Sequence, residues 1–219
     1  MKKICSLVLA CVLSAAMFVG LTGCGDKDDK KGNNTVMNEL EIGEGIHIDN
    51  TTPGSEFIIS QGADTEYVIA ISATATNNEM KAAGVVQNFF LEATGQTLDI
   101  KDETTLSSSD KVISVGNTQR GLSAGVAFDA SELTDSGFVI KTVGDGVYIN
   151  GGNNGICYAA YELLNRLFGM EYYAEYCYFI EKNVTQLKLQ NFDIKERPDF
   201  EFRNPAMGYI TRTDDAYLR

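Results

Sequence analysis

The side chains that most often carry out catalysis are sparse in this sequence. His47 is the only histidine, and beyond residue 24 the only cysteines are Cys157 and Cys177. A nucleophile paired with histidine would have to recruit His47 from a segment that we expect to be unstructured, and one histidine with two separated cysteines makes no zinc site. The Asp-x-Asp-x-Asp-Gly pattern of a calcium loop is absent as well. We therefore predict no catalytic residue, no metal ligand and no cofactor in this chain.

Cys157 and Cys177 allow two interpretations. An exported protein can hold them as a disulfide, although their spacing in the sequence fixes no geometry. Cys157 falls on or beside the apolar face of a predicted helix, where a small buried thiol is the simpler interpretation. We favour free thiols and keep the disulfide as the alternative.

A glycine-rich turn, Gly151-Gly152-Asn153-Asn154-Gly155, connects a predicted strand to a predicted helix. Backbone N–H groups in such a turn, together with the positive end of the helix, can bind an anion, which makes Asn153 and Asn154 candidate ligand-binding residues. The spacing differs from G-x-G-x-x-G, no P-loop lysine follows, and the preceding strand belongs to a hairpin. These departures favour a structural role, in which the glycines permit a close turn and an asparagine caps the helix.

Aromatic residues crowd the segment that follows this helix: Tyr172, Tyr173, Tyr176, Tyr178 and Phe179. Exposed tyrosines can stack on sugar rings through their apolar faces, which makes Tyr172, Tyr173 and Tyr176 candidate ligand-binding residues. The alternative, which we favour, is that the cluster belongs to a core or to an interface with another domain.

Two amphipathic helices position these residues. One is predicted to run from a cap at Asn77–Asn78 to Gly95, and the other from a cap at Asn153–Asn154 to Gly169. Each has an apolar face with three- and four-residue spacing. The apolar positions are Ala82, Val85, Val86, Phe89 and Ala93 in the first helix, and Ile156, Ala159, Ala160, Leu163, Leu164, Leu167 and Phe168 in the second.

Runs of β-branched and aromatic residues predict the strands. The Gly-Asp-Gly at 144–146 predicts a tight hairpin between 138–143 and 147–149, and the continuously apolar 67–71 predicts a central strand. Further strands are predicted at 57–59, 98–101 and 111–115, and residues 116–130 are either a short helix or a loop. The fold class that follows is α/β (α+β), a mixed β-sheet with two main amphipathic helices packed on it and preceded by a disordered tether.

The apolar residues of the last predicted strand do not all fall on the same face of a regular strand. Leu187 and Leu189 share one face, whereas Phe192 and Ile194 fall on the other. A bulge or bend near Gln190-Asn191 would be needed to bring all four side chains inward.

The N-terminus has the pattern of an export signal. Lys2 and Lys3 precede an apolar stretch, residues 4–19, that is too short for a membrane span. Leu21-Thr22-Gly23-Cys24 then resembles the cleavage box of bacterial lipoproteins, which implies that residues 1–23 are removed and that Cys24 carries the membrane lipid. An ordinary secretory signal with a chance cysteine is the alternative. The expected location is the extracytoplasmic face of a bacterial membrane.

Residues 24–55 are predicted to be a flexible tether after the lipidated cysteine, because GDKDDKKGNNT is charged and without periodicity. The alternation of Ile42, Ile46 and Ile48 suits an edge strand, but Gly43 and Gly45 oppose it. The formal net charge is −12 at pH 7. Such a chain has no electrostatic attraction to nucleic acid or to an anionic bilayer, so the expected membrane contact rests on the lipid.

One stretch carries a family resemblance. GFVI, GVYINGGNNGICYAAYELLNRLFGMEYY, Arg197-Pro198-Asp199-Phe200 and Phe202-Arg203 follow one another in this order. The order resembles the small α/β domain that precedes the catalytic barrel in α-glucuronidases, β-hexosaminidases and a group of bacterial surface proteins with a hydrolase-like barrel. The resemblance extends from about Glu56 to Arg203, and it indicates a type of domain and not a substrate.

The resemblance implies that residues 56–199 are the α/β accessory domain and that residues 200–219 begin a barrel whose paired carboxylates lie outside this sequence. Asp214 and Asp215 are adjacent and point in different directions, so they form no acid/base pair. The expected chain is a non-catalytic N-terminal accessory domain of a glycoside hydrolase-like, cell-surface carbohydrate-processing lipoprotein, truncated before its partner, the barrel. The alternative is a free-standing surface lipoprotein that binds a glycan.

Overall fold

The computed structural model describes residues 44–54, 58–62, 65–174 and 176–199, all of which belong to one structural unit. The predicted signal peptide (1–23), the lipidation site Cys24, most of the tether and the segment 200–219 lie outside the described residues. Within the described ranges, no helix is both long enough and apolar enough to cross a membrane.

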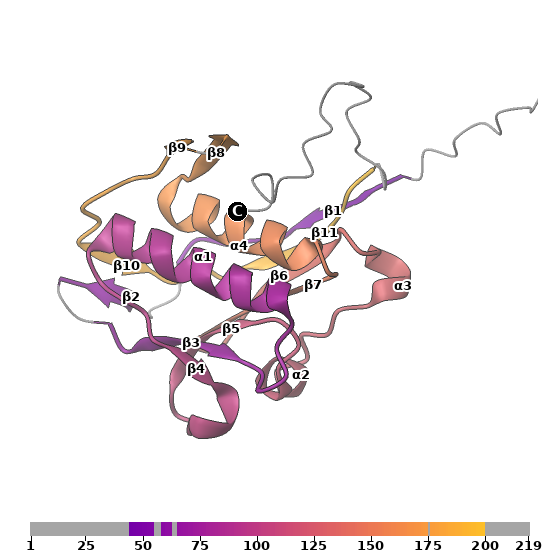
Figure 1. Cartoon of the computed structure of the whole chain (residues 1–219), viewed down its shortest axis with the longest axis horizontal. Helices are drawn as coiled ribbons and strands as arrows, with labels where there is room; N and C mark the ends of the chain where they lie inside the picture. Colours follow the sequence, from indigo (N-terminus) through magenta and orange to yellow (C-terminus); the bar gives the residue numbers. More distant parts are fainter. Residues whose placement is uncertain (1–43, 55–57, 63–64, 175, 200–219) are drawn as a thin grey trace, which may run out of the picture. The chain divides into compact units, whose positions relative to one another are not determined.

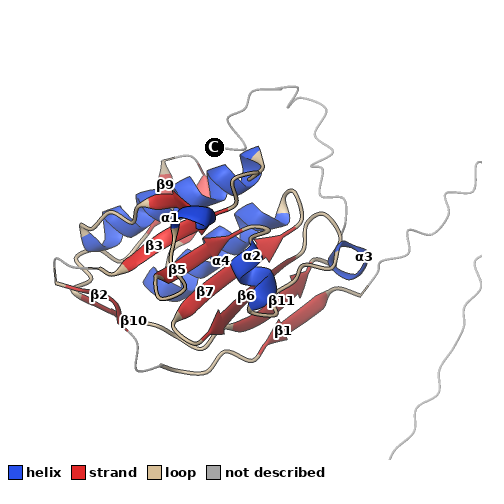
Figure 2. Cartoon of the chain, turned by 90° about the horizontal axis from the view of Figure 1, so that it is seen from below, coloured by secondary structure: helices blue, strands red, loops and turns tan. Residues whose placement is uncertain are grey.

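Seven strands form one mixed sheet. They are β1 (Ile46–Asp49), β3 (Tyr67–Ile71), β4 (Ile100–Asp102), β5 (Lys111–Val115), β6 (Phe138–Val143), β7 (Gly146–Gly151) and β11 (Asp193–Arg197). Their order across the sheet is β1-β11-β6-β7-β5-β3-β4 (Figures 1 and 2). The pairs among β7, β5, β3 and β4 are parallel, and the pairs among β7, β6, β11 and β1 are antiparallel. The predicted fold class, the 138–149 hairpin and the central position of 67–71 are confirmed.

Two long helices, α1 (Asn77–Thr94) and α4 (Gly155–Phe168), lie side by side on one face of this sheet (Figure 1). The short helix α2 (Gln119–Ser123) lies on the opposite face, where Gly121 is close to Tyr148 of β7 (Figure 2). A second short helix, α3 (Ala130–Leu133), precedes β6, and a 3-10 turn spans Glu103–Thr105. The ambiguous segment 116–130 therefore contains α2 and the beginning of α3.

The N-terminal cap of α1 differs from the prediction. The cap is Thr76, whose hydroxyl accepts the backbone N–H of Glu79 at 3.2 Å while the Glu79 carboxylate accepts the N–H of Thr76 at 2.6 Å. This reciprocal capping box satisfies two backbone donors, so Asn77–Asn78 falls inside the helix. Both helices end as predicted, because Gly95 and Gly169 adopt left-handed backbone conformations with φ of 77° and 59°.

The core lies between the sheet and the two long helices. Phe90 of α1 and Phe168 of α4 are fully buried, and their rings meet edge to face with centroids 5.7 Å apart. The apolar face predicted for α4 is buried from end to end. Burial of such faces is the main stabilising contribution to a fold of this size.

Two small sheets lie outside the main one. β2 (Ile58–Gln61) pairs with β10 (Gln186–Lys188), and β8 (Glu171–Ala174) pairs with β9 (Cys177–Phe179). The strand predicted at 57–59 therefore belongs to a separate sheet. The four apolar residues at the end of the chain are all buried, and the chain is interrupted between β10 and β11, where a bulge or bend was expected. The pairing of β10 with β2 also shifts its register between Leu187 and Lys188. The four residues are Leu187, Leu189, Phe192 and Ile194.

The Thr142 hydroxyl of β6 occupies this break. It donates a hydrogen bond to the carbonyl oxygen of Gln190 at 2.7 Å and accepts the backbone N–H of Phe192 at 3.0 Å. The threonine hydroxyl therefore supplies the hydrogen bonds that these two backbone groups would otherwise make to a neighbouring strand.

The tether prediction was wrong for its last part. Residues 46–49 form β1, which pairs antiparallel with β11, and Thr52 bridges to Asn191. The folded domain therefore begins before Glu56. An edge strand tolerates this sequence because only one side of β1 needs hydrogen-bond partners.

Candidate functional site

The glycine-rich turn before α4 already holds a carboxylate of the same chain. The backbone N–H of Asn153 donates to Asp135 Oδ1 at 3.1 Å, and the Asn154 side-chain amide donates to Asp135 Oδ2 at 2.8 Å. Asn154 is the N-cap, although its side chain makes no capping hydrogen bond. The negative charge that the positive end of α4 attracts is thus supplied by Asp135.

Carboxylates of the chain occupy the other helix N-termini at this edge of the sheet in the same way. Glu79 caps α1 and also accepts the backbone N–H of Asn117 at 2.7 Å. Glu103 accepts the N–H groups of Gln119 and Arg120 at the start of α2. This is the edge where α/β proteins commonly bind ligands. Here the backbone N–H groups named above already donate to carboxylates, several of them from neighbouring loops.

The glycines of the turn serve close packing. A Cβ atom on Gly155 would overlap the carbonyl oxygen of Gly137, and one on Gly152 would overlap the backbone of Asp135. The chain segment 135–137 lies directly against the turn, with the N–H of Gly152 donating to the carbonyl of Gly137 at 3.0 Å. The structure thus accounts for the glycines by packing of backbone on backbone.

The predicted aromatic residues lie on the β8–β9 hairpin. Its inner side is fixed to the helices: the Tyr178 ring meets Phe89 of α1 edge to face at 5.2 Å, and the Tyr172 ring lies 5.3 Å from Tyr161 of α4. Tyr172 and Tyr178 stack across the hairpin with centroids 6.4 Å apart. The Tyr178 hydroxyl donates to Glu92 at 3.0 Å, and this hydrogen bond raises the pKa of Tyr178.

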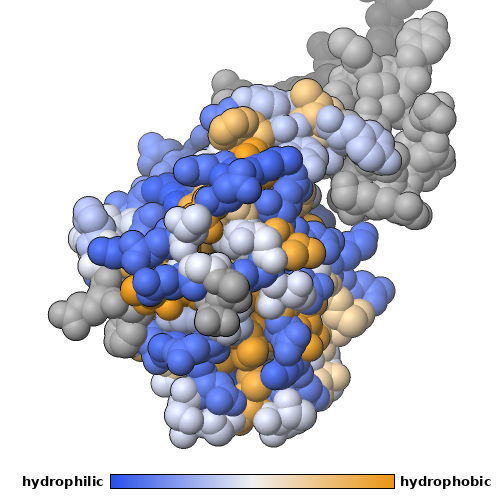
Figure 3. Space-filling model, turned by 90° about the vertical axis from the view of Figure 1, so that its left-hand side faces the viewer, coloured by the Kyte–Doolittle hydropathy of each residue, from blue (hydrophilic) through white to orange (hydrophobic). Residues whose placement is uncertain are grey.

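The outer side of the hairpin faces solvent. The exposed fractions are 67% for Tyr173, 91% for Tyr176 and 59% for Phe179. Seen from the side of β2, β9 and β10, the surface is mostly hydrophilic with separate hydrophobic patches (Figure 3). A shallow groove of about 660 Å³ runs along the hairpin, lined by Glu92, Tyr176, Tyr178, Phe179, Ile180, Glu181 and Lys182.

Both cysteines of the folded domain are free, so the disulfide alternative is wrong. The Cys157 thiol is half-buried and donates to the carbonyl oxygen of Asn78 at 3.8 Å, and burial raises its pKa. Cys177 is exposed on β9.

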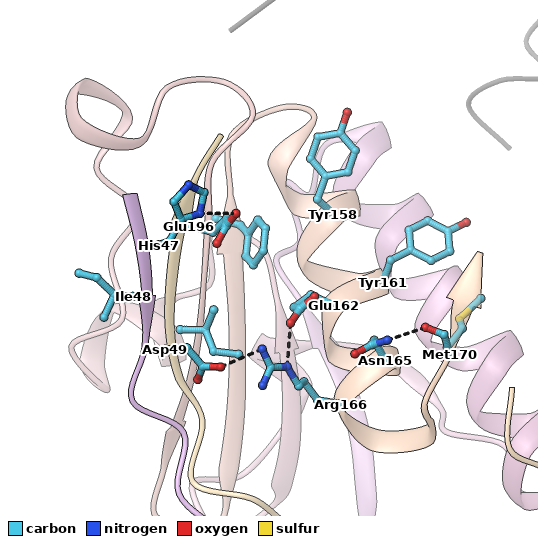
Figure 4. A pocket seen from close by; sticks show the side chains of 12 residues that line it. His47, Ile48, Asp49, Tyr158, Tyr161, Glu162, Asn165, Arg166, Met170 and Glu196 are labelled. Atoms are coloured by element: carbon cyan, nitrogen blue, oxygen red, sulfur yellow. Dashed lines mark hydrogen bonds and ion pairs between the residues drawn. The ribbon is translucent and has the colours of Figure 1, made fainter. Parts of the chain in front are cut away.

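A second concave region separates α4 from the β1–β11 edge of the sheet. α4 covers β6 and β7, and the sheet continues beyond the helix to β11 and β1, which leaves a cleft of about 410 Å³ (Figure 4). Its floor is apolar, because Phe138, Met170 and Ile194 line it and each is less than 10% exposed. Its rim is polar, with side chains from β1, β11 and α4: His47, Asp49, Tyr158, Glu162, Arg166 and Glu196.

Arg166 connects the two walls at one end of the cleft. Its guanidinium group lies 2.7 Å from Glu162 on the next turn of α4 and 2.8 Å from Asp49 on β1, and Figure 4 shows both carboxylates directed toward it. The hydrogen bond to Glu162 is the main reason why the pKa of Arg166 is raised. Hydrogen bonds from Thr51, and then the charge of Arg166, lower the pKa of Asp49.

His47 connects the strands at the other end. Its Nδ1 lies 3.0 Å from Glu196 on β11, and its Nε2 lies 3.2 Å from Asp199, which also accepts the backbone N–H of Gly45 at 2.9 Å. The hydrogen bond to Asp199, followed by the charge of Glu196, raises the pKa of His47 and favours the imidazolium form.

Sequence reasoning missed this cleft. His47 was expected in a tether, and Glu196 lies 149 positions away from it in the chain. A signal was present in α4, where Tyr158, Glu162 and Arg166 recur every four residues and form a polar stripe beside the apolar face. Among the residues that the structure describes, no group of three or more side chains is arranged to hold a metal ion.

Comparisons with known proteins give matches among solved structures alone, since no protein-family model and no curated protein matches the chain. The chain is similar to a GH20 β-N-acetylhexosaminidase from Streptomyces coelicolor, with 13% identity and a TM-score of 0.43 over 70% of this chain and 28% of that one. It is also similar to a β-hexosaminidase mutant from Streptomyces plicatus in complex with the product GlcNAc. The sequence identity is 12% and the TM-score is 0.43, over 70% of this chain and 25% of that one.

A GH20 exo-β-N-acetylglucosaminidase from Vibrio harveyi, in complex with N-acetylglucosamine, gives 15% identity and a TM-score of 0.40 over 73% of this chain and 19% of that chain. The chain therefore spans only about a quarter of the length of the solved enzymes that it resembles.

Proposed function

We propose that this chain is the non-catalytic accessory domain of a lipid-anchored, carbohydrate-processing surface protein, and that the β8–β9 hairpin is the surface on which a catalytic barrel packs. The observation that carries the proposal is the exposed aromatic side of that hairpin. Rings as large as those of Tyr173, Tyr176 and Phe179 bury much apolar area when a partner covers them. The order of sequence motifs from Gly137 to Arg203 supports the same role through its resemblance to domains that precede such barrels.

The backbone at the tip of the hairpin gives further support. Tyr176 has a φ of 61°, in the left-handed region that glycine and asparagine normally occupy. Backbone strain of this kind persists where it has a use, and here it holds an aromatic ring away from the domain with 91% of its surface exposed. The second half of the hairpin is anchored by Tyr178 on α1, so the exposed rings are presented on a fixed support.

Lipid attachment is tested in the full chain expressed in a bacterium that processes lipoproteins. We expect the chain to incorporate an alkyne-tagged fatty acid and to fractionate with membranes, and we expect Cys24→Ala to abolish both. Cys177→Ala, which removes an exposed thiol of the folded domain, should change neither. Membrane recovery of the Cys24→Ala protein without label would contradict the lipid anchor.

The packing surface is tested with the coding sequence that continues beyond the Arg219 codon. If it encodes a barrel with paired carboxylates, we expect the barrel, produced separately, to bind the full chain. Replacing both Tyr173 and Phe179 by serine should weaken this binding by about tenfold or more, since loss of about 1.4 kcal/mol is enough for that factor. Leu122→Ser, an exposed apolar residue on α2, is the matched control. An unrelated downstream sequence, or equal weakening by Leu122→Ser, would contradict the proposal.

A second function, glycan binding by the hairpin itself, is favoured by one observation. The groove along the hairpin combines aromatic rings with hydrogen-bonding groups, since Glu92 accepts from Tyr178 and pairs with Lys182 at 2.8 Å. Sugar sites need both kinds of group. Binding of an oligosaccharide that is lost on Phe179→Ala, in a chain that binds no barrel, would make this the function.

A further inference from the structure

The structure assigns a sugar-binding site to the cleft between α4 and the β1–β11 edge, and we infer that it takes a neutral sugar ring. The inference rests on the proposed carbohydrate role. It adds a sugar-binding site that is separate from the β8–β9 hairpin. The volume of about 410 Å³ lies within the range of small-molecule sites.

The first argument is the division of the cleft into an apolar floor and a polar rim. Phe138, Met170 and Ile194 offer a surface for the C–H face of a ring. The charged groups stand around it on three different elements: β1, β11 and α4. A pyranose has the same division, with C–H groups on its faces and hydroxyl groups at its edge, whereas a purely apolar ligand would offer no hydrogen bond to the rim.

The second argument is that the rim is held in position and still has hydrogen-bonding capacity. Among the described residues, Glu162 uses Oε1 toward Arg166, and Glu196 uses Oε1 toward His47. The second oxygen of each carboxylate remains an acceptor for a ligand hydroxyl. Because Arg166 and His47 fix the carboxylates from both ends, these acceptors need little reordering when a ligand binds, which lowers the entropic cost of binding.

The third argument concerns charge and decides between classes of sugar. Asp49, Glu162 and Glu196 line the cleft, and the cations that face them are Arg166 and His47, beside Asp199. The chain as a whole has a formal charge of −12. An acidic sugar would therefore meet more carboxylates than cations, whereas the hydroxyls of a neutral sugar donate to those carboxylates.

Tyr158 gives the most direct test. Its side chain lines the cleft from α4, is 46% exposed and is not part of the buried core, so Tyr158→Ala should fold. The control is Leu122→Ala on α2, an exposed apolar residue that lies outside both the cleft and the hairpin groove. The probes are cellobiose as a neutral sugar and galacturonic acid as an acidic one, each titrated into the full chain in mild detergent and followed by saturation-transfer difference NMR.

We expect saturable binding of cellobiose, weakened about tenfold by Tyr158→Ala and unchanged by Leu122→Ala. Galacturonic acid should not bind the unaltered chain, and Glu196→Gln, which removes one negative charge from the rim, should allow it to bind measurably. Absence of saturable cellobiose binding, equal binding of both sugars to the unaltered chain, or loss on Phe179→Ala with no loss on Tyr158→Ala would each overturn the inference. Failure of the cleft to bind sugar while a barrel still docks on the hairpin would leave the proposed function intact.

Discussion

Gly155→Ala should destabilise the domain by about 3 kcal/mol or more, which is the upper part of the range for an overpacked site. The added methyl group overlaps the carbonyl oxygen of Gly137, and this oxygen also accepts the N–H of Gly152, so neither segment can shift without losing a hydrogen bond. In urea unfolding followed by circular dichroism, we expect a lower midpoint with an unchanged slope.

The control is the same substitution in the other long helix. Gly84 lies within α1, and apart from its chain neighbours and the backbone of the same helix, a Cβ atom there has no atom within 4 Å. Gly84→Ala should therefore stabilise the domain by about 0.5–1 kcal/mol, because alanine loses less conformational freedom in a helix. If Gly155→Ala lowers the free energy of unfolding while Gly84→Ala raises it, the loss is caused by packing at the turn. A neutral Gly155→Ala would show that segment 135–137 does not lie against α4.

Phe168→Ala should cost about 3–5 kcal/mol, the usual range for loss of a fully buried aromatic ring. Phe168 is 0% exposed, and its ring contacts Phe90, so the change opens a cavity where α4 and α1 meet. Total stabilities of domains are about 5–15 kcal/mol. Thermal unfolding should therefore show a large fall in Tm, and part of the protein is expected to be unfolded at 37 °C.

Phe179→Ala is the comparison for this second change. The ring is 59% exposed on β9, so its removal should alter the free energy of unfolding by no more than about 0.5 kcal/mol. A large loss of stability on Phe179→Ala would mean that the hairpin is part of the core, and it would remove the basis for treating its outer side as a surface for a partner.

The sequence predicted the elements whose signals are local. The spacing of apolar residues located both long helices, and Gly95 and Gly169 marked their ends because their left-handed conformation is typical of a C-cap. The cap of α1 was missed although Thr76 and Glu79 form a capping box that is visible in the sequence. The prediction relied on the cap preference of Asn77 and Asn78. It did not consider the capping-box pairing of Thr76 with Glu79, three residues later.

Pairings between distant segments were less predictable. β1 has four residues, with Gly43 and Gly45 just before it, and its register depends on β11 at the other end of the domain. No local pattern reports such a partner. The cleft was missed for the same reason, because β1 and β11, the two strands of one of its walls, come from opposite ends of the described domain. The candidates Asn153, Asn154, Tyr172, Tyr173 and Tyr176 came from local patterns alone, and their roles in binding stay predictions.

The pairing of β1 with β11 also decides how the domain bears mechanical load. In this antiparallel pair Ile46 lies opposite Arg197, so the chain enters and leaves the domain at the same end of the two strands. If the proposed lipid anchor and barrel are both present, a pull between them would open this pair one hydrogen bond at a time and would not shear the whole ladder at once. Asp199, which accepts from Gly45 and His47, lies at that end. Under such a pull its hydrogen bonds to Gly45 and His47 would therefore break before the β1–β11 ladder opens.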